Sequence, residues 1–405
     1  MISRPANVFA LLSLSTMLLA ATAGAEDWHR WRGPDANGIS KETGWQSQWP
    51  AEGPKQLWKV SVGTGFSSMT VSQGRVYTLG NDGDKTDTVY CLDAATGAIV
   101  WKYAYECALD PHFYEGGPSA TPVENDGLVY SLSRKGDFFC LDAAKGTVIW
   151  KKDLHAGDFA NEIPTWGFSG SPLVEGNLVI LDVGAAGIAF DKKTGNPAWT
   201  SGKSVSGYAT PVPFNSGKTR CVAISAVDTL EAIAVADGKK VWSFPWKTTY
   251  DINATDPIIS DSKVFISSGI GHGCALLDIS QAEPKVIWQN KNMKTHFNTS
   301  VLWDGYLYGV DESPALKCIS WETGEVKWSD SKFGKGSLIL ADGKIIGLSD
   351  KGELIIAEAS PACFKPISRA QVLGGKCWTT PVLSNGRIYC RNAKGDLVCL
   401  DVSGK

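Results

Sequence analysis

The chain has 405 residues, of which 43% are hydrophobic and 20% are charged, and this composition excludes a disordered polypeptide. Its net charge of -3 gives no electrostatic reason to expect a nucleic acid or an anionic membrane as a partner. The 16 tryptophans are unusual in number, and they require a structural explanation.

Residues 1–25 have the features of a secretory signal peptide. Arg4 precedes an apolar stretch from Val8 to Ala21, which is short for a membrane span, and an A-x-A cleavage site ends at Ala25. An uncleaved anchor is the alternative, but small residues crowd the end of this stretch. No cysteine follows the cleavage point before Cys91, so a lipid acceptor is missing there. We therefore predict a periplasmic or secreted protein with no transmembrane segment after cleavage.

Residues 26–56 are predicted to form an extended N-terminal arm. This arm contains the sequence WRGPDANG and four tryptophans. We expect it to lie along the surface of the rest of the protein and to bury some of these side chains, which are Trp28, Trp31, Trp45 and Trp49.

Beyond the arm, tryptophans recur at intervals of 43, 49, 49, 43, 46 and 40 residues. A period of about 40–45 residues with four short strands per unit is typical of a propeller blade. The unit from Ser119 to Trp150 shows four apolar segments separated by Gly, Asn and Asp turns, which predicts an antiparallel meander. The repeating tryptophans are Trp58, Trp101, Trp150, Trp199, Trp242, Trp288 and Trp328.

Eight such units can be aligned, and residues 57–405 are therefore predicted to form an all-β, eight-bladed propeller of four-stranded antiparallel blades. In the seventh unit, Phe364 stands roughly where a tryptophan is expected. The last unit ends after its third strand, whereas an unassigned strand around Trp58 precedes the first unit. We predict that this N-terminal strand completes the last blade, because such closure removes an exposed sheet edge. The alternative is an open solenoid.

Two other recurring residue types fit the same blade. A glycine stands four residues before the tryptophan in five units, as a turn with positive φ requires. Four cysteines occupy equivalent blade positions that are too far apart to pair, so we expect them to be buried thiols: Cys91, Cys140, Cys318 and Cys399. A disulfide from Cys363 to Cys377, or one involving Cys390, stays open.

The segments from Asp93 to Trp101 and from Asp191 to Trp199 resemble the tryptophan-docking repeat of quinoprotein propellers. The chain is similar to the PQQ-like β-propeller repeat family of exported bacterial proteins, which includes the BamB outer-membrane assembly factor group. The resemblance implies the fold and leaves the function open. The chain lacks the adjacent cysteine pair of the PQQ alcohol dehydrogenases and the lipid-acceptor cysteine of BamB-like factors.

A quinone cofactor with calcium would need hard oxygen ligands and a carboxylate base. The best local cluster is Asp251, Asn253 and Asp256, for which a self-capping loop is the alternative reading. We expect no cofactor and no metal site, and PQQ with calcium remains the alternative.

The residues around the strand openings are better candidates for a binding site. Two series, one including Thr121 and Thr210 and the other Ser119 and Tyr208, alternate before the first strand of each unit, so one series should face the axis. Their hydroxyls could form a polar funnel for a ligand or could satisfy backbone groups at a tight centre.

Two long loops, residues 105–117 and 158–168, lead into first strands and combine aromatic side chains with carboxylates, which suits a sugar ring or a peptide. Packing of the loops on each other is the alternative. The predicted ligand-binding residues are His112, Tyr114, Glu115, Trp166, Phe168, Tyr208, Asp256, Phe297 and Trp378.

The favoured hypothesis is an exported, monomeric, non-catalytic scaffold that binds an envelope protein or a glycan. A PQQ-dependent oxidoreductase acting on an alcohol or sugar is the first alternative. A polysaccharide lyase or hydrolase that uses His112 and Glu115 is the second.

Overall fold

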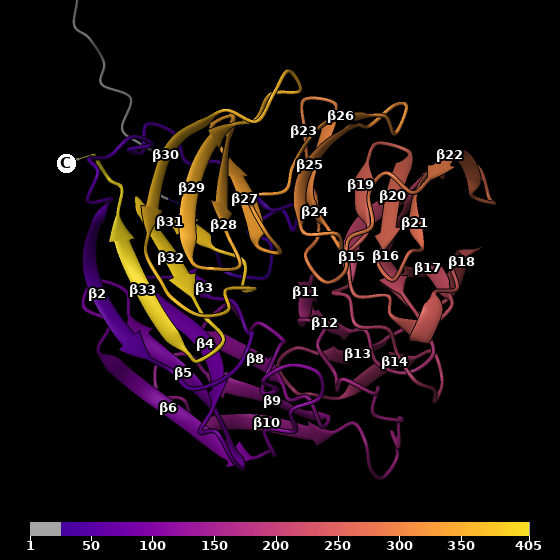
Figure 1. Cartoon of the computed structure of the whole chain (residues 1–405). Helices are drawn as coiled ribbons and strands as arrows, with labels where there is room; N and C mark the ends of the chain where they lie inside the picture. The colour runs from indigo at the N-terminus through magenta and orange to yellow at the C-terminus, as the bar shows by residue number, and fades with distance from the viewer. Residues whose placement is uncertain (1–25, 405) are drawn as a thin grey trace, which may run out of the picture.

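Eight antiparallel sheets surround a central axis in the computed structural model, which describes residues 26–404 (Figure 1). The predicted signal peptide lies outside the described residues. Within that range, no helix is long and apolar enough to cross a membrane. The eight-bladed, all-β propeller predicted from the repeats is confirmed.

Each of the first seven blades is a meander of four consecutive strands that runs from the axis outward. Blade 1 comprises β3 (Thr70–Ser72), β4 (Arg75–Asn81), β5 (Thr86–Asp93) and β6 (Ile99–Glu106). Blade 2 comprises β7 (Val123–Asn125), β8 (Leu128–Leu132), β9 (Asp137–Asp142) and β10 (Val148–Asp153). Blade 3 comprises β11 (Leu173–Glu175), β12 (Leu178–Leu181), β13 (Ile188–Asp191) and β14 (Pro197–Thr200). Blade 4 comprises β15 (Val212–Ser216), β16 (Thr219–Ser225), β17 (Thr229–Ala234) and β18 (Lys240–Pro245).

A short 3-10 helix, η1 (Thr249–Asp251), precedes blade 5. Blade 5 comprises β19 (Ile258–Ser260), β20 (Lys263–Ser268), β21 (Gly273–Asp278) and β22 (Lys285–Asn290). Blade 6 comprises β23 (Val301–Trp303), β24 (Tyr306–Asp311), β25 (Ala315–Ser320) and β26 (Val326–Asp330). Blade 7 comprises β27 (Ser337–Ala341), β28 (Lys344–Leu348), β29 (Glu353–Glu358) and β30 (Pro366–Gln371).

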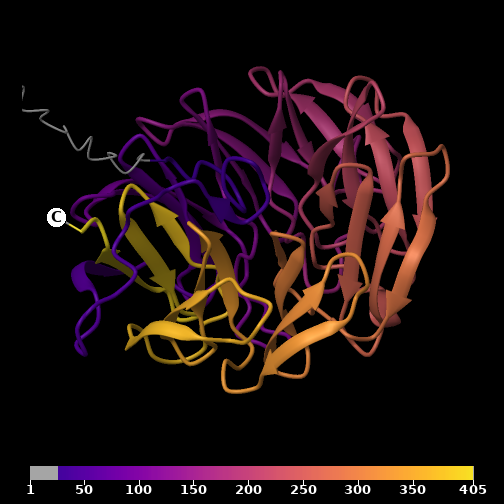
Figure 2. The ribbon, with the colours of Figure 1, turned by 90° about the horizontal axis from the view of Figure 1, so that it is seen from above.

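Blade 8 joins the two ends of the chain, as predicted. It contains β31 (Val382–Ser384), β32 (Arg387–Arg391) and β33 (Asp396–Asp401), and its outer strand is β2 (Lys55–Ser61). In β2, Trp58 is paired with Cys399 of β33. The indigo N-terminal strand and the yellow C-terminal strand lie side by side in Figure 1, and Figure 2 shows the closed ring from above. No sheet edge is therefore left open by the chain ends.

The repeating tryptophans bind each blade to the next. The Trp58 indole nitrogen donates to the carbonyl of Ala94 at 3.0 Å, and Trp101 donates to Ala143 at 2.9 Å. Five of the seven rings also cover the turn glycine of the following blade, where an added Cβ would come within 2.6–2.8 Å of the ring. The glycines with this role are Gly97, Gly146, Gly195, Gly238 and Gly324, all at positive φ. The glycine is thus required by the turn and by the tryptophan together.

Blade 7 corrects one alignment. Ser368, and not Phe364, occupies the tryptophan position, because it pairs with Ile356 next to the same bulge that flanks the tryptophans elsewhere. Phe364 lies in the preceding turn, where its ring is 5.5 Å from that of Trp328 of blade 6. The turn is two residues longer than in blade 1, and Phe364 lies four residues before Ser368, so the extra length explains only part of the misalignment.

The four equivalent cysteines are buried, as expected from their blade position. All ten cysteines carry free thiols, which include the exposed Cys363 and the buried Cys377 and Cys390. The two disulfides left open by the sequence are absent from the described residues.

Candidate binding site

A ring of hydrogen bonds lines the axis where the inner strands begin. In blades 3 to 6, the side chain before the strand opening accepts from a backbone N–H of the preceding blade: Ser171 from Thr121 at 2.9 Å, Thr210 from Ser171 at 3.0 Å, Asp256 from Thr210 at 2.8 Å and Thr299 from Asp256 at 2.9 Å. Of the two alternatives for these hydroxyls, satisfaction of backbone groups at a tight centre describes this inner ring. The ring fixes the blades and leaves the residues above it to contact a ligand.

The N-terminal arm reaches this ring from the opposite end of the axis. Trp28 forms a backbone bridge with Val71, and β1 (Ile39–Ser40) pairs in parallel with β27, so the arm crosses the ends of the inner strands. Between these contacts, Trp31 and Arg32 enter the channel. The arm was expected to lie along the propeller surface; instead, this turn lies inside, because a buried carboxylate there provides a partner for Arg32.

Asp256 is the residue that holds the turn in place. Its Oδ2 accepts from the Trp31 indole nitrogen at 2.7 Å and lies 3.8 Å from the Arg32 Nε. Arg32 also donates to the carbonyls of Thr299 and Ser300 at 3.2 and 2.9 Å. Burial lowers the pKa of Arg32 to about 10, so its charge persists at neutral pH, whereas burial raises the pKa of Asp256.

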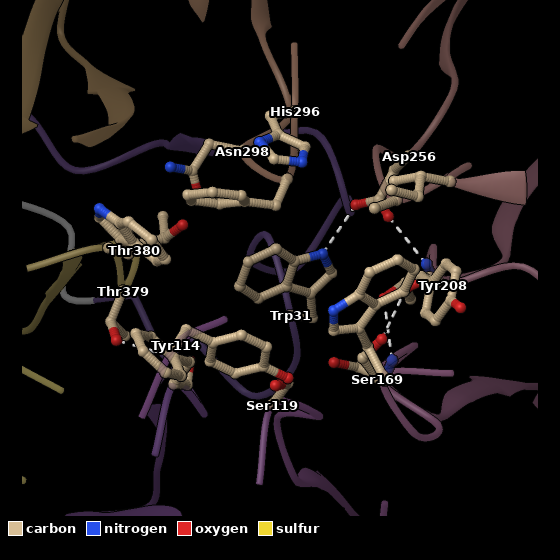
Figure 3. A pocket seen from close by; sticks show the side chains of 18 of the residues that line it. Trp31, Tyr114, Ser119, Ser169, Tyr208, Asp256, His296, Asn298, Thr379 and Thr380 are labelled. Atoms are coloured by element: carbon tan, nitrogen blue, oxygen red, sulfur yellow. Dashed lines mark hydrogen bonds between the residues drawn. The ribbon is translucent and has the colours of Figure 1, made fainter. Parts of the chain in front are cut away.

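Above Trp31 opens a cavity of about 630 Å³, which we call the funnel. Figure 3 shows Trp31 in the middle of the view, with Tyr114, Tyr208, His296 and Thr380 around it. Seven connections between blades contribute to the lining, which is mainly aromatic. It also includes the hydroxyls of Ser119, Ser169, Ser171, Thr210, Thr379 and Thr380. The Phe, Tyr and Trp residues are Trp31, Phe66, Phe113, Tyr114, Trp166, Tyr208, Tyr250, Phe297 and Trp378.

Two pairs of aromatic rings contribute to this lining, one from the first half of the blades and one from the second. The ring centroids of Trp166 and Tyr208 are 5.8 Å apart in an edge-on arrangement, and those of Phe297 and Trp378 are 4.7 Å apart. Phe66 links the second pair to Tyr114, with centroid separations of 5.7 Å to Trp378 and 5.4 Å to Tyr114. Rings that pack on each other in this way form a rigid apolar wall.

The funnel rim carries exposed apolar side chains on strained backbone. Phe113, Tyr250 and Ile270 are 90%, 71% and 39% exposed, and their φ angles are 64°, 61° and 52°. All three line the funnel. Bulky residues seldom adopt positive φ, and such strain is concentrated at sites that contact ligands. The rim therefore presents side chains that packing within the chain does not explain.

Six of the nine residues predicted from the sequence line the funnel: Tyr114, Trp166, Tyr208, Asp256, Phe297 and Trp378. Glu115 lies behind this lining in an ion pair of 2.8 Å with Lys376. His112 is exposed and lies edge-on to Trp166 at 6.0 Å. The structure places Phe168 elsewhere, because it is 1% exposed and packs in the core of blades 2 and 3. His112 and Glu115 are not brought together as an acid–base pair by any described contact.

Trp31 and His296, two funnel residues with ring nitrogens, are not among the residues predicted from the sequence. The arm motif around Trp31 was recognised, but no residue spacing shows that it enters the channel. His296 directly precedes Phe297, a predicted residue, and its position next to a mouth residue is the signal that could have identified it.

The predicted calcium ligands do not converge. Asn253 is buried, donates to the carbonyls of Ala226, Val227 and Trp246, and accepts from Ser268. Both oxygens of Asp256 have partners within the chain. Among residues 26–404, no group of three or more His, Cys, Asp or Glu side chains is arranged to hold a metal ion. These donors therefore do not fit calcium or a free catalytic carboxylate.

Comparison with known families assigns the fold. Residues 40–109 and 88–330 match the model of the family described as outer membrane protein assembly factor BamB. The chain belongs to this PQQ-like propeller family. No curated protein matches the chain.

Solved structures of BamB and of dehydrogenases share the propeller. BamB from Moraxella catarrhalis is 15% identical with a TM-score of 0.63, over 86% of this chain and 97% of that one. Quinohemoprotein alcohol dehydrogenase from Comamonas testosteroni is 14% identical with a TM-score of 0.73, over 95% and 82%. A europium-containing methanol dehydrogenase is 13% identical with a TM-score of 0.66, over 93% and 89%. At these identities the likeness establishes the fold alone.

Proposed function

We propose that this BamB-family chain is an exported, non-catalytic binding protein of the cell envelope whose funnel holds a glycan. The observation that carries the proposal is the aromatic funnel with exposed side chains on a strained rim. Its volume of about 630 Å³ is in the range of small-molecule sites, and its mainly apolar lining with a few hydroxyls is typical of them. Aromatic faces pack against the apolar faces of sugar rings, while hydroxyls bond their edges.

A binding role is favoured over catalysis by the state of the carboxylates. Asp256 is held by Trp31, Arg32 and Thr210, and Glu115 is held by Lys376. A general base needs a carboxylate that can accept a proton from the substrate. Asp256, the carboxylate that lines the funnel, is therefore already engaged within the chain.

The experiment is a glycan panel titrated into the mature protein, residues 26–405, followed by calorimetry on each ligand that binds. Trp378→Ala and Trp166→Ala each remove one aromatic wall and should weaken binding at least about tenfold, as expected for loss of a buried aromatic contact. Trp49→Ala is the matched control, because this indole lies on the arm and donates to Arg369 outside the funnel. Absence of binding to every glycan, or equal affinity in all three variants, would contradict the proposal.

A PQQ-dependent oxidoreductase is the second candidate, and the dehydrogenase neighbours favour it. Its test is titration with PQQ and calcium, monitored by quinone absorbance and a dye-linked alcohol assay. Saturable binding together with dye reduction would replace the scaffold proposal. Shortening of a bound polysaccharide would instead replace it with a lyase or hydrolase.

A further inference from the structure

Blade 7 places a lysine next to two aromatic residues that line the funnel. Lys335 lies two residues before Ser337, the first residue of the inner strand β27. Phe297 in blade 6 and Trp378 in blade 8 hold the same position, two residues before Thr299 and Thr380. The Lys335 Nζ lies 5.0 Å from the centroid of the Phe297 ring and 5.5 Å from that of Trp378. Both rings line the funnel, whereas Lys335 itself does not, so the ammonium lies against the rings that form the wall.

The hydrogen-bond partner of this ammonium is a histidine. Lys335 Nζ is 2.8 Å from His296 Nδ1. An ammonium only donates, so Nδ1 must accept, and the proton of the neutral imidazole is then on Nε2. Burial, and then the charge of Lys335, lowers the pKa of His296 to about 4. His296, which lines the funnel, is therefore a neutral N–H donor at pH 7.

The other charges near this wall are neutralised within the chain. Lys376 pairs with Glu115 at 2.8 Å, and Glu312 pairs with Lys294 at 3.1 Å while also accepting from the Gly271 backbone. Lys335 differs, because its partner in the described part of the chain is an uncharged imidazole. The charges of Glu312 and Lys376 act on Lys335 in opposite directions. One side of the funnel thus combines an N–H donor with an excess positive charge.

We propose that the funnel selects acidic glycans, with a sugar carboxylate accepting the Nε2–H of His296 beside the Lys335 ammonium. This inference rests on the proposed glycan-binding function. The aromatic wall of Phe297 and Trp378 would hold the sugar ring, and the paired cation and donor would hold its acid group. Hydrogen bonds that involve an ionised group are the stronger ones, so the acid group decides selectivity.

The test compares trigalacturonate with its fully methyl-esterified form, which keeps the rings but removes the charge. Calorimetry on the mature protein should show the acid binding at least about tenfold more tightly than the ester, the ratio expected for one charged hydrogen bond. In Lys335→Met this ratio should fall toward one. Added salt should reduce the preference in the unmodified protein but not in the variant.

Lys332→Met is the matched control, because it removes the same charge from an exposed position in the same loop. It should keep the preference for the acid. Thermal unfolding of each variant checks that the fold is intact, and Lys335→Arg, which retains the charge, provides a second variant that should bind the acid. Equal binding of acid and ester, or an unchanged ratio in Lys335→Met, overturns this inference alone. If neither these ligands nor any neutral glycan binds, the proposed function fails with it.

Discussion

The indole nitrogen of Trp31 donates a 2.7 Å hydrogen bond to Oδ2 of Asp256, which joins the N-terminal arm to the axis of the propeller. The same carboxylate accepts from the Thr210 backbone through its other oxygen. A single side chain therefore belongs both to the ring that fixes the blades and to the contact that holds the funnel floor. Stability of the fold and shape of the site are coupled at this point.

Trp31→Phe tests this coupling. The substitution keeps an aromatic floor but removes a donor to a buried charged acceptor, so the free energy of unfolding should fall by about 1.5–3 kcal/mol. Chemical denaturation measures it. Trp49→Phe is the control, because its indole donates at 3.3 Å to the Arg369 carbonyl at an exposed site and should cost much less. Equal losses in the two variants would show that the Trp31–Asp256 bond does not hold the arm.

The fold was predictable because each repeat contains the residues that define a blade. The interval between tryptophans, the turn glycine four residues earlier and the unassigned strand at Trp58 each have one structural explanation, and together they give blade number and closure. Blade 7 was misaligned at Phe364, which lies four residues before Ser368 in a turn that is two residues longer than that of blade 1. A local insertion cannot be detected by counting when the tryptophan itself is missing.

The site was predictable only in part, for a different reason. Tyr208, Phe297 and Trp378 were found because they share one position in the repeat, and repeat symmetry brings such positions to the axis. Trp31 lies outside the repeats, so nothing periodic indicates where it packs. The structural roles of a non-repeating arm depend on contacts more than 200 residues away in sequence.

Gly146→Ala tests the tryptophan-docking turn. Gly146 has φ +71°, and a Cβ there would lie 2.6 Å from the Trp101 ring, whereas Gly127 has φ +78° with nothing within 4 Å. Both alanine variants carry backbone strain of about 1–2 kcal/mol. Gly146→Ala should in addition displace Trp101 and cost at least about 1 kcal/mol more. Melting temperatures measure the difference, and equal shifts would show that the turn does not need space for the indole.

Trp101→Phe and Trp242→Phe separate the indole hydrogen bond from ring packing. Both tryptophans are buried at equivalent positions, but Trp101 donates to Ala143, whereas the Trp242 nitrogen has no partner among the described residues. The longer turn of blade 5 lacks the docking glycine, which accounts for the difference. Trp101→Phe should cost about 1 kcal/mol more than Trp242→Phe in chemical denaturation, because only the Trp101 substitution removes a hydrogen bond. A larger loss at Trp242 would overturn this assignment.

Asp182 gives a prediction of pH dependence. It is buried next to Asp256, and both its oxygens lack partners among the described residues. Burial, and then the charge of Asp256, holds the pKa of Asp182 well above its ordinary value. The stability that the raised pKa of Asp182 contributes is therefore fully present below the unfolded-state pKa of about 3.9. It is lost as the pH rises from that value through the raised folded-state pKa.

Asp182→Asn should remove this dependence. At pH 7 the variant should be more stable than the unmodified protein by about 1–3 kcal/mol, because it no longer needs a buried proton to stay neutral. Below about pH 3.9 the two should converge, since Asp182 is then protonated in both the folded and the unfolded states. Asp82→Asn is the control of opposite sign, because backbone N–H groups, first that of Asp84, lower the pKa of this exposed carboxylate. Denaturation curves across this pH range measure both variants, and a stability gain for Asp182→Asn that is constant with pH would show that Asp182 is not protonated in the folded protein.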